Sequence, residues 1–228
     1  MMIITCEHGG NKIPKAFQRL FEQHREILET HCSYDKGALI TARSMAKYFR
    51  APLFAATTSR LLVDLNRRVD HPRLFSQFTR HLAPEVKQKI LRRHYFAHRD
   101  SILKAVTQAI EAGQDVLQIA CHSFTPFFND RERPMDVGLL YDPRRTEERD
   151  LCRRWKNAMR RIQPQLNISS NAPYKGVSDG LTTYLRTLFP KGYRGIELEL
   201  NQRLFLQERA AWRNLNQIVI QGLAEAVC

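Results

Sequence analysis

The sequence predicts an α/β protein with a largely parallel sheet. Short apolar runs rich in β-branched residues, such as residues 2–5 and 136–141, have the length of buried strands. They alternate with longer segments whose apolar residues recur at helical spacing, such as 146–162 and 208–227. Strands that alternate with helices along a chain form a mainly parallel sheet packed against helices. The fold class that follows is an α/β sandwich.

A single domain is expected to span residues 1–228. No composition shift or Pro/Gly/Ser-rich linker divides the chain, and 43% hydrophobic and 26% charged residues are typical of a globular protein. No apolar run approaches the roughly 18 residues that a membrane helix needs. The amino terminus lacks the pattern of a secretory signal, and five scattered cysteines without C-x-x-C spacing are typical of reduced thiols. These features predict a cytoplasmic protein.

The net charge of +13 raises the possibility of an anionic partner, such as nucleic acid, a membrane surface or a small acid. The arginines stand in short clusters on predicted helices and are interleaved with acids, as in residues 144–150. No aromatic residues are spaced among them to stack bases, and no helix-turn-helix or zinc-finger spacing occurs. We interpret most of this charge as solvated surface and expect no nucleic-acid or membrane partner.

The first half of the chain places polar residues at the ends of predicted strands. Its expected elements are a strand at 2–5, helices at 15–30 and 35–49, and strands at 51–56 and 61–64. His8 follows the first strand, and Gly9 and Gly10 allow a sharp turn or a close backbone approach there. Asp35 opens the second helix. Segment 59–68 mixes charged and apolar residues in a way that suggests polar groups converging on a ligand.

The second half repeats the pattern of strand, polar residue and loop. Its expected elements are a helix at 84–113, strands at 114–121, 136–141 and 167–170, helices at 146–162 and from about 180, a strand at 193–200 and a helix at 208–227. His122 directly follows one strand. Glu197 and Glu199 share one side of another, because side chains alternate along a strand. Segment 171–186, rich in Gly, Asn, Ser and Thr, is expected to be a functional loop.

Four of these residues predict a metal-dependent hydrolytic site. His8, His122 and Asp35 supply two imidazoles and one carboxylate, the usual protein ligands of a catalytic zinc ion that keeps a position open for water. Glu199, which is not one of these ligands, can take the proton of the water and pass it to a leaving amine. This pattern points to amide hydrolysis. Most of the other histidines, such as those at 94 and 98, are expected on the surface.

Five segments resemble, in order and over nearly the whole chain, the N-formylglutamate amidohydrolase family. They are CEHGGNKIP at 6–14, YDKGA at 34–38, SRLLVDLNR at 59–67 with His71-Pro72 soon after, CHSFTP at 121–126 and IELELNQRLF at 196–205. The resemblance implies a three-layer α/β/α sandwich with a mixed, largely parallel sheet, as in zinc-dependent exopeptidases. It also implies zinc-dependent deacylation of a small N-acyl amino acid, with N-formyl-L-glutamate as the nearest named substrate.

The resemblance also suggests how substrate is bound. Residues 64–67, Asp-Leu-Asn-Arg, are similar to a stretch that holds the substrate carboxylate in the related aspartoacylases. By that similarity Asn66 and Arg67 bind the acid, a role that suits the planar guanidinium of arginine. Arg60 would polarise the scissile carbonyl, where negative charge develops. We also expect Arg186, at the end of the loop 171–186, to bind substrate.

The chain departs from the wider exopeptidase pattern at Asn11, which stands where a glutamate ligand is usual three residues after the first histidine. We therefore expect Asp35 as the third ligand, as in zinc amidases of muramoyl substrates, which take theirs from a following helix. Asn11 and another carboxylate are the alternatives. Glu199 is preferred to Glu197 as the base because it directly precedes the Leu-Asn-Gln segment that matches the family signature.

Two other functions stay open at this point. The same fold without catalysis would serve as an anion-binding module, which the basic charge would suit. A zinc amidase acting on muropeptides is the second alternative, and the lack of an export signal disfavours it.

Overall fold

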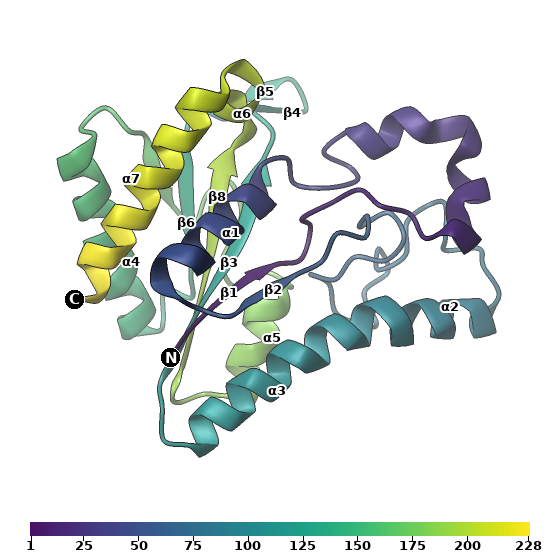
Figure 1. The fold of residues 1–228 in the computed structure, drawn as a ribbon, viewed down its shortest axis with the longest axis horizontal. Helices are drawn as coiled ribbons and strands as arrows, with labels where there is room; N and C mark the ends of the chain where they lie inside the picture. Colours follow the sequence, from purple (N-terminus) through teal and green to yellow (C-terminus); the bar gives the residue numbers. More distant parts are fainter.

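The computed structural model describes all 228 residues and is built around a six-stranded sheet (Figure 1). The strands are β1 (Met2–Cys6), β2 (Leu53–Ala55), β3 (Val116–Phe124), β6 (Val137–Leu140), β7 (Ile168–Ser170) and β8 (Tyr193–Asn201). Their order in the sheet is β2-β1-β3-β8-β6-β7. β2, β1, β3 and β8 are mutually parallel, whereas β6 is antiparallel to β8 and parallel to β7. The expected mixed, largely parallel sheet is confirmed.

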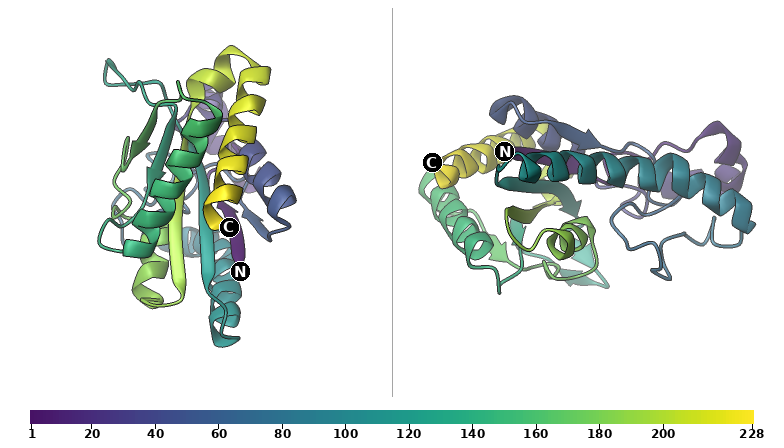
Figure 2. Two further views of the ribbon diagram at one scale, coloured as in Figure 1. Left: turned by 90° about the vertical axis from the view of Figure 1, so that its left-hand side faces the viewer. Right: turned by 90° about the horizontal axis from the view of Figure 1, so that it is seen from below.

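Helices cover both faces of the sheet, which completes the expected three layers (Figures 1 and 2). α1 (Ala38–Phe49), α4 (Thr146–Ile162) and α7 (Arg209–Val227) pack on one face through the largest hydrophobic core. α3 (Ala97–Glu111) and α5 (Leu181–Leu188) pack on the other through a smaller one. None of the helices is both long enough and apolar enough to span a bilayer.

The alternation of side chains along a strand decides which face of the sheet each side chain occupies. On β8, Ile196, Leu198 and Leu200 enter the largest core. Glu197 and Glu199 therefore lie on the opposite face, as predicted. That face is the one covered by α3 and α5. β3 lies beside β8 in the sheet.

The segment 59–82 and the helix that follows it extend beyond the β2 edge of the sheet (Figure 1). Their apolar side chains form a third hydrophobic core. Here α2 (Pro84–Ile90) runs through a π-helical turn, η2 (Leu91–Phe96), directly into α3, so the long helix expected over 84–113 is present. The prediction of a strand at 61–64 is wrong. Leu62 and Val63 pack against α2 and η2, and the backbone forms turns instead of joining the sheet.

Several local features also differ from the prediction. α1 begins at Ala38 because Gly37 has φ +83° and cannot continue a helix, so Asp35 stands outside it. The segment expected as one or two helices at 15–30 is the 3₁₀ helix η1 (Lys15–Glu29), kinked at His24. The hairpin of β4 (Phe127–Phe128) and β5 (Arg131–Glu132) and helix α6 (Gln202–Gln207) were not predicted.

Gly9 and Gly10 allow a close approach between two backbone segments. Neither has a positive φ. A Cβ atom at Gly9 would lie 2.9 Å from the carbonyl oxygen of Ala56, and one at Gly10 would lie 2.6 Å from that of Thr57. The glycines thus let the chain after β1 run directly against the chain after β2, which fixes the position of His8.

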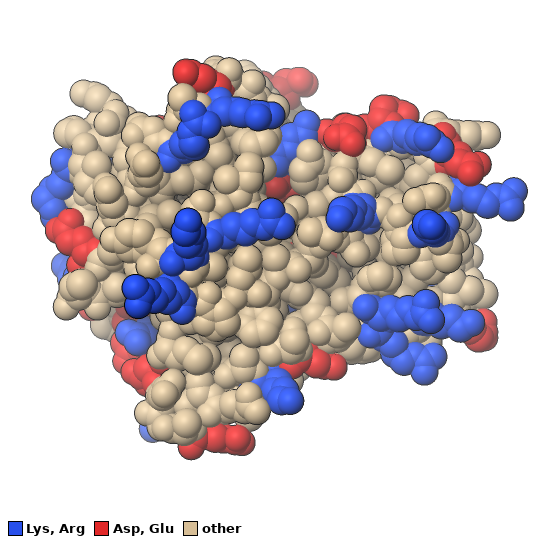
Figure 3. Space-filling model, viewed as in Figure 1, with Lys and Arg blue, Asp and Glu red and all other residues tan.

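Basic side chains are spread over the surface in separate groups. On the face drawn in Figure 3, Lys and Arg lie in several patches with Asp and Glu between them. The excess positive charge of the sequence is therefore not gathered into one continuous stripe on this face.

Candidate active site

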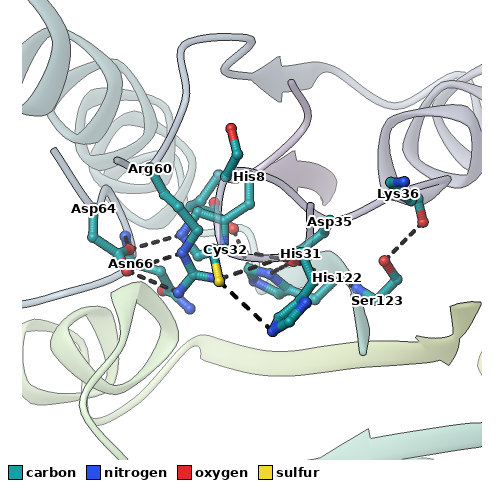
Figure 4. Close-up of polar contacts among 12 residues, drawn as sticks. His8, His31, Cys32, Asp35, Lys36, Arg60, Asp64, Asn66, His122 and Ser123 are labelled. Carbon is teal, nitrogen blue, oxygen red and sulfur yellow. Dashed lines mark hydrogen bonds and ion pairs between the residues drawn. The ribbon is translucent and has the colours of Figure 1, made fainter. Parts of the chain in front are cut away.

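Three buried side chains converge where β1 and β3 end (Figure 4). His8 follows β1, His122 lies within β3, and Asp35 precedes α1. Nδ1 of His122 lies 2.9 Å from Oδ2 of Asp35, and Nδ1 of His8 lies 3.5 Å from the same oxygen. One potential ligand atom from each residue lies within 4.8 Å of the others. We call His8, Asp35 and His122 the histidine cluster; the sequence pattern had singled out all three.

The backbone holds Asp35 in position. Its amide donates to the carbonyl oxygen of His8 at 2.9 Å, and the amide of Ser123 lies 3.4 Å from Oδ2 of Asp35. The Ser123 hydroxyl donates to the carbonyl oxygen of Lys36 at 2.8 Å. The carboxylate of Asp35 is therefore fixed between β1 and β3 and makes no capping hydrogen bond to α1.

Each histidine of the cluster also faces a second carboxylate. Oδ1 of Asp64 lies 2.7 Å from Nε2 of His8, and Oε2 of Glu7 lies 3.1 Å from Nε2 of His122. A carboxylate that accepts the Nε2 proton leaves Nδ1 available as a metal ligand. Without a metal, Nδ1 of His122 donates a hydrogen bond to Asp35 at 2.9 Å. Sequence reasoning missed both roles. For Glu7 a signal existed, because a buried strand that ends in Glu-His places two polar groups together.

The histidine cluster has the donor set of a catalytic zinc site, and it can hold a metal ion. Zinc bonds of about 2.0–2.1 Å in a tetrahedron place ligand atoms about 3.3 Å apart, between the two measured separations. Nδ1 of His8 is buried and has no hydrogen-bond partner, which is costly without a ligand. The alternative ligand Asn11 is directed elsewhere, since its amide nitrogen donates to the Leu28 carbonyl and to Glu29.

Opposite charges in and around the cluster shift the pKa values of its side chains. Burial alone would raise the pKa of Asp35, but His8 and His122 hold that pKa far below its usual range. Burial alone would lower the pKa of His122, but Asp35 and Glu7 raise it well above its usual value. The carboxylates therefore favour a positive charge between them, which either a proton or a metal ion supplies.

Glu199 stands beside His122 in the register of β3 and β8. Its side chain is buried, and its Oε2 has no hydrogen-bond partner. Burial, together with the charges of Asp35 and Glu197, raises the pKa of Glu199 to about 8, although His122 opposes the shift. A carboxyl group in this range can exchange a proton near neutral pH. Glu197 differs, because it accepts a hydrogen bond from the Thr182 hydroxyl at 2.8 Å.

A cavity of about 230 Å³ opens over the cluster, and only Tyr174 of its 13 lining residues is hydrophobic. The cavity brings together every predicted site residue but one: His8, Asp35, Arg60, Asn66, Arg67, His122 and Glu199. Oδ1 of Asn66 accepts the Leu181 amide at the start of α5 at 2.7 Å, so the Asn66 amide group is fixed and its nitrogen is free to donate. Such a polar lining suits a small charged ligand.

Arg60 is oriented by Asp64. Its Nε and Nη2 lie 3.2 and 2.8 Å from Oδ2 of that carboxylate, and its Nη1 lies 3.5 Å from Asp35. Burial alone would lower the pKa of Arg60, but Asp64 and Asp35 raise it, so the guanidinium is permanently charged.

Arg186, which was expected to bind substrate, is not among the residues that line the cavity. Its side chain is 6% exposed, and its Nε lies 3.0 Å from Oε1 of Glu148. The two remaining guanidinium nitrogens donate to the carbonyl oxygens of Gly176 and Gly195. The guanidinium is thus engaged within the protein, and Arg186 connects α4, α5 and β8.

The geometry agrees with a comparison against protein families, in which residues 1–206 match the model of N-formylglutamate amidohydrolase. The chain belongs to the N-formylglutamate amidohydrolase family. Membership in this family makes the protein an amidohydrolase by class. The resemblance found in the five sequence segments is thereby confirmed.

Two crystal structures share the fold of this family member. A gene product from Agrobacterium tumefaciens has 24% sequence identity and a TM-score of 0.82, over 99% of this chain and 90% of that one. An N-formylglutamate amidohydrolase from Ralstonia eutropha JMP134 has 18% identity and a TM-score of 0.72, over 99% and 92% of the two chains. A comparison with curated proteins finds no match.

Proposed function

We propose that this member of the N-formylglutamate amidohydrolase family is a zinc-dependent hydrolase of small N-acyl amino acids with an acidic side chain, of the N-formyl-L-glutamate type. One observation carries the proposal. Nδ1 of His8 and Nδ1 of His122 converge on Asp35 beside the buried Glu199, in a cavity lined almost wholly by polar groups. Family membership supports amide hydrolysis as the reaction.

In this proposal His8, Asp35 and His122 hold the metal ion. Bound zinc would supply a Lewis acid and lower the pKa of a coordinated water to about 7. Asp64 and Glu7 would keep both imidazoles in the tautomer that presents Nδ1. The three ligands leave the cavity side of the site open for water and substrate.

Glu199 is proposed as the general base and then the general acid. Its unpaired Oε2 is positioned beside His122, where it would accept the proton of the attacking water. It would then hand that proton to the amine nitrogen as the amide bond breaks. The raised pKa of about 8 in the metal-free chain suits the second step, and a nearby divalent cation would favour the ionised form needed for the first.

Arg67 and Asn66 are proposed to bind the carboxylate of the amino acid. The Arg67 guanidinium is only weakly engaged, with its Nε 3.8 Å from Asp64, so its remaining donors are available for a bidentate contact. The fixed amide nitrogen of Asn66 would donate beside it. Arg60, held by Asp64, would direct Nη1 at the carbonyl oxygen, where negative charge develops.

Three basic groups of the cavity support an acidic substrate over an apolar one, although four carboxylates, Asp35, Asp179, Glu197 and Glu199, also line it. Lys175 joins Arg60 and Arg67 in the lining, while a single aromatic side chain offers little apolar contact. An acidic side chain on the substrate would pair with one of these basic groups, whereas an apolar one would desolvate polar groups without pairing them.

Metal analysis tests the proposal directly. The wild-type protein, His8→Ala, His122→Ala and a control, His24→Ala, are purified and assayed for zinc and for hydrolysis of N-formyl-L-glutamate and N-formyl-L-leucine. We expect zinc and activity toward the acidic substrate in the wild type and in His24→Ala, whose histidine is 55% exposed. Both should be lost in the two cluster variants. Equal zinc content in all four proteins would refute the site.

A conservative change at Arg67 tests substrate binding separately. Arg67→Lys keeps the charge but cannot bind a carboxylate through two parallel hydrogen bonds. We expect kcat/KM to fall about tenfold or more, with zinc content unchanged. Unaltered kinetics would remove Arg67 from the substrate site.

A further inference from the structure

The two histidines of the cluster are each supported by a carboxylate, and each carboxylate is supported by a further basic side chain. On one side His8 faces Asp64, which binds Arg60 through two hydrogen bonds. On the other side His122 faces Glu7 at 3.1 Å, and the second oxygen of Glu7 lies 3.6 Å from Nε2 of His98. His98 therefore occupies, relative to His122, the place that Arg60 occupies relative to His8.

Glu7 needs this second partner because it is sealed from solvent. The residue is 1% exposed, and no backbone amide or hydroxyl group donates to its carboxylate. The imidazoles of His122 and His98 are the only basic groups within 4.0 Å of it. A buried carboxylate without partners is strongly unfavourable, so both imidazoles help to hold Glu7 in place.

His98 is itself held firmly, although the sequence pattern suggested a surface position. Its side chain is 9% exposed, and it lies in the first turn of α3, directly after the π-helical turn η2. The neighbouring Arg99 donates to the carbonyl oxygens of Leu65 and Arg67, and the Tyr95 hydroxyl donates to Arg67 as well. These contacts fix the helix against the loop that carries the substrate-binding motif, and with it the position of the His98 ring.

We propose that His98 is a positioning residue for the metal site, acting through Glu7 on the orientation of His122. This inference rests on the proposed function, because it presumes that His122 binds the metal. His98 touches neither metal nor substrate. With His98 in place, each oxygen of Glu7 lies within 4.0 Å of the Nε2 atom of an imidazole. Without it, Oε1 of Glu7 has no basic group within 4.0 Å, and the carboxylate that faces His122 is held less firmly.

The test uses variants at His98 with matched variants at His94. His94 lies four residues earlier, lines the same groove between β2 and α3 as His98, and has no carboxylate within 4.0 Å. His98→Leu removes the contact, whereas His98→Gln keeps an amide nitrogen near the place of Nε2. His94→Leu and His94→Gln repeat both changes where no contact exists. Zinc affinity is measured by competition with a coloured chelator, and site geometry by the visible spectrum of the cobalt-substituted protein.

We expect His98→Leu to lower zinc affinity about tenfold, as removal of outer partners of metal ligands does, and to alter the cobalt spectrum. His98→Gln should stay within about threefold of the wild type, and both His94 variants within about twofold. If His98→Leu does not fold, His98→Asn serves in its place, because its shorter side chain cannot reach Glu7. A merely structural role would lower thermal stability without separating Gln from Leu or Asn in zinc affinity.

Two results would overturn the inference. If the wild type and His98→Leu bind zinc equally well, or if His98→Gln loses as much affinity as His98→Leu, His98 does not act through Glu7. Failure of the wild type to bind zinc is a different outcome. It would refute the proposed metal site, and the role of His98 with it.

Discussion

Two groups of buried charged side chains flank β8, and they differ in how completely their polar atoms are paired. The histidine cluster lies beside Glu199 in the carboxyl-terminal half of the strand. Arg186 and Glu148 lie beside Gly195 near its start. Nδ1 of His8, Nε2 of His122 and Oε2 of Glu199 have no hydrogen-bond partner, whereas neither Arg186 nor Glu148 leaves a buried polar atom unpaired.

The Arg186–Glu148 pair shows what a structural group of buried charges looks like. Both oxygens of Glu148 accept hydrogen bonds, from Arg186 and the amide of Gly195 on one and from the amide of Asp142 on the other. The folded chain completes this group by itself. The histidine cluster is complete only when something else binds, and unpaired groups that converge on a cavity are therefore the better indicator of function.

We expect the largest effect on catalysis from removing the charge of Glu199. Glu199→Gln keeps the shape of the side chain but removes the base, so we expect turnover to fall about 10²- to 10⁴-fold with zinc content unchanged. Steady-state kinetics and metal analysis of one preparation measure both. Full activity in this variant would transfer the role of base to Glu197 or end the scheme.

Breaking the paired group should instead cost stability. Arg186→Met leaves Glu148 buried and without its main cation, so we expect the free energy of unfolding to fall by about 3–5 kcal/mol, measured by urea denaturation. The exposed pair Arg161–Glu225 provides the control, and Arg161→Met should change stability by at most about 0.5 kcal/mol. Zinc binding by the folded fraction should persist. A stable Arg186→Met protein with a selective loss of substrate affinity would return Arg186 to the binding site.

Metal removal tests whether the histidine cluster is stabilised by a bound ion. Zinc at a hundred times its dissociation constant should stabilise the wild type by about 2.7 kcal/mol, and His122→Ala should gain almost nothing. The metal-free His122→Ala protein should be less stable than the metal-free wild type, because it loses the hydrogen bond between His122 and Asp35 and leaves Glu7 without its nearest cation. Thermal unfolding with zinc and with a chelator measures all four states. An equal zinc-dependent shift in both proteins would contradict the assignment.

The smallest expected effect is a pH dependence specific to the metal-free site. The folded-state pKa of Glu199 is raised from the ordinary 4.5 to about 8. The folded protein therefore binds the extra proton between these values, and the associated stability, fully present below 4.5, is lost as pH rises through about 8. Unfolding free energies of the wild type and Glu199→Gln should thus diverge by about 1 kcal/mol or more between about pH 5 and 8. Parallel curves would show that Glu199 is not perturbed.

Regular patterns explain why so much of the site was predictable. The ends of parallel strands meet at one edge of a sheet, so strands ending near His8 and His122 had to bring these residues together. Alternation along β8 placed Glu197 and Glu199 on one side. Each of these inferences used the sequence within one element and a rule that holds for every such element. Recognition of the five motifs then linked the residues to a reaction.

Arg186 and His98 show where such rules stop. An arginine at the end of a polar loop resembles a substrate-binding residue, and a histidine on a basic helix resembles a surface residue. Glu148 and Glu7, their partners in the fold, lie on elements distant in the sequence. No local sequence pattern indicates whether a carboxylate from a distant segment lies within reach of a given side chain.

The sequence by itself determined the α/β architecture, the delivery of His8, His122 and Glu199 to one side of the sheet, and the family. Those outcomes follow from hydrophobic periodicity and from motifs, which are local properties of a chain. Only the tertiary structure decided that Asp35 faces both imidazoles, that Asn11 turns away, and that the charge of Arg186 is already paired. These depend on distances between side chains that only packing of remote segments brings together, because electrostatic pairing and burial act in space and not along the chain.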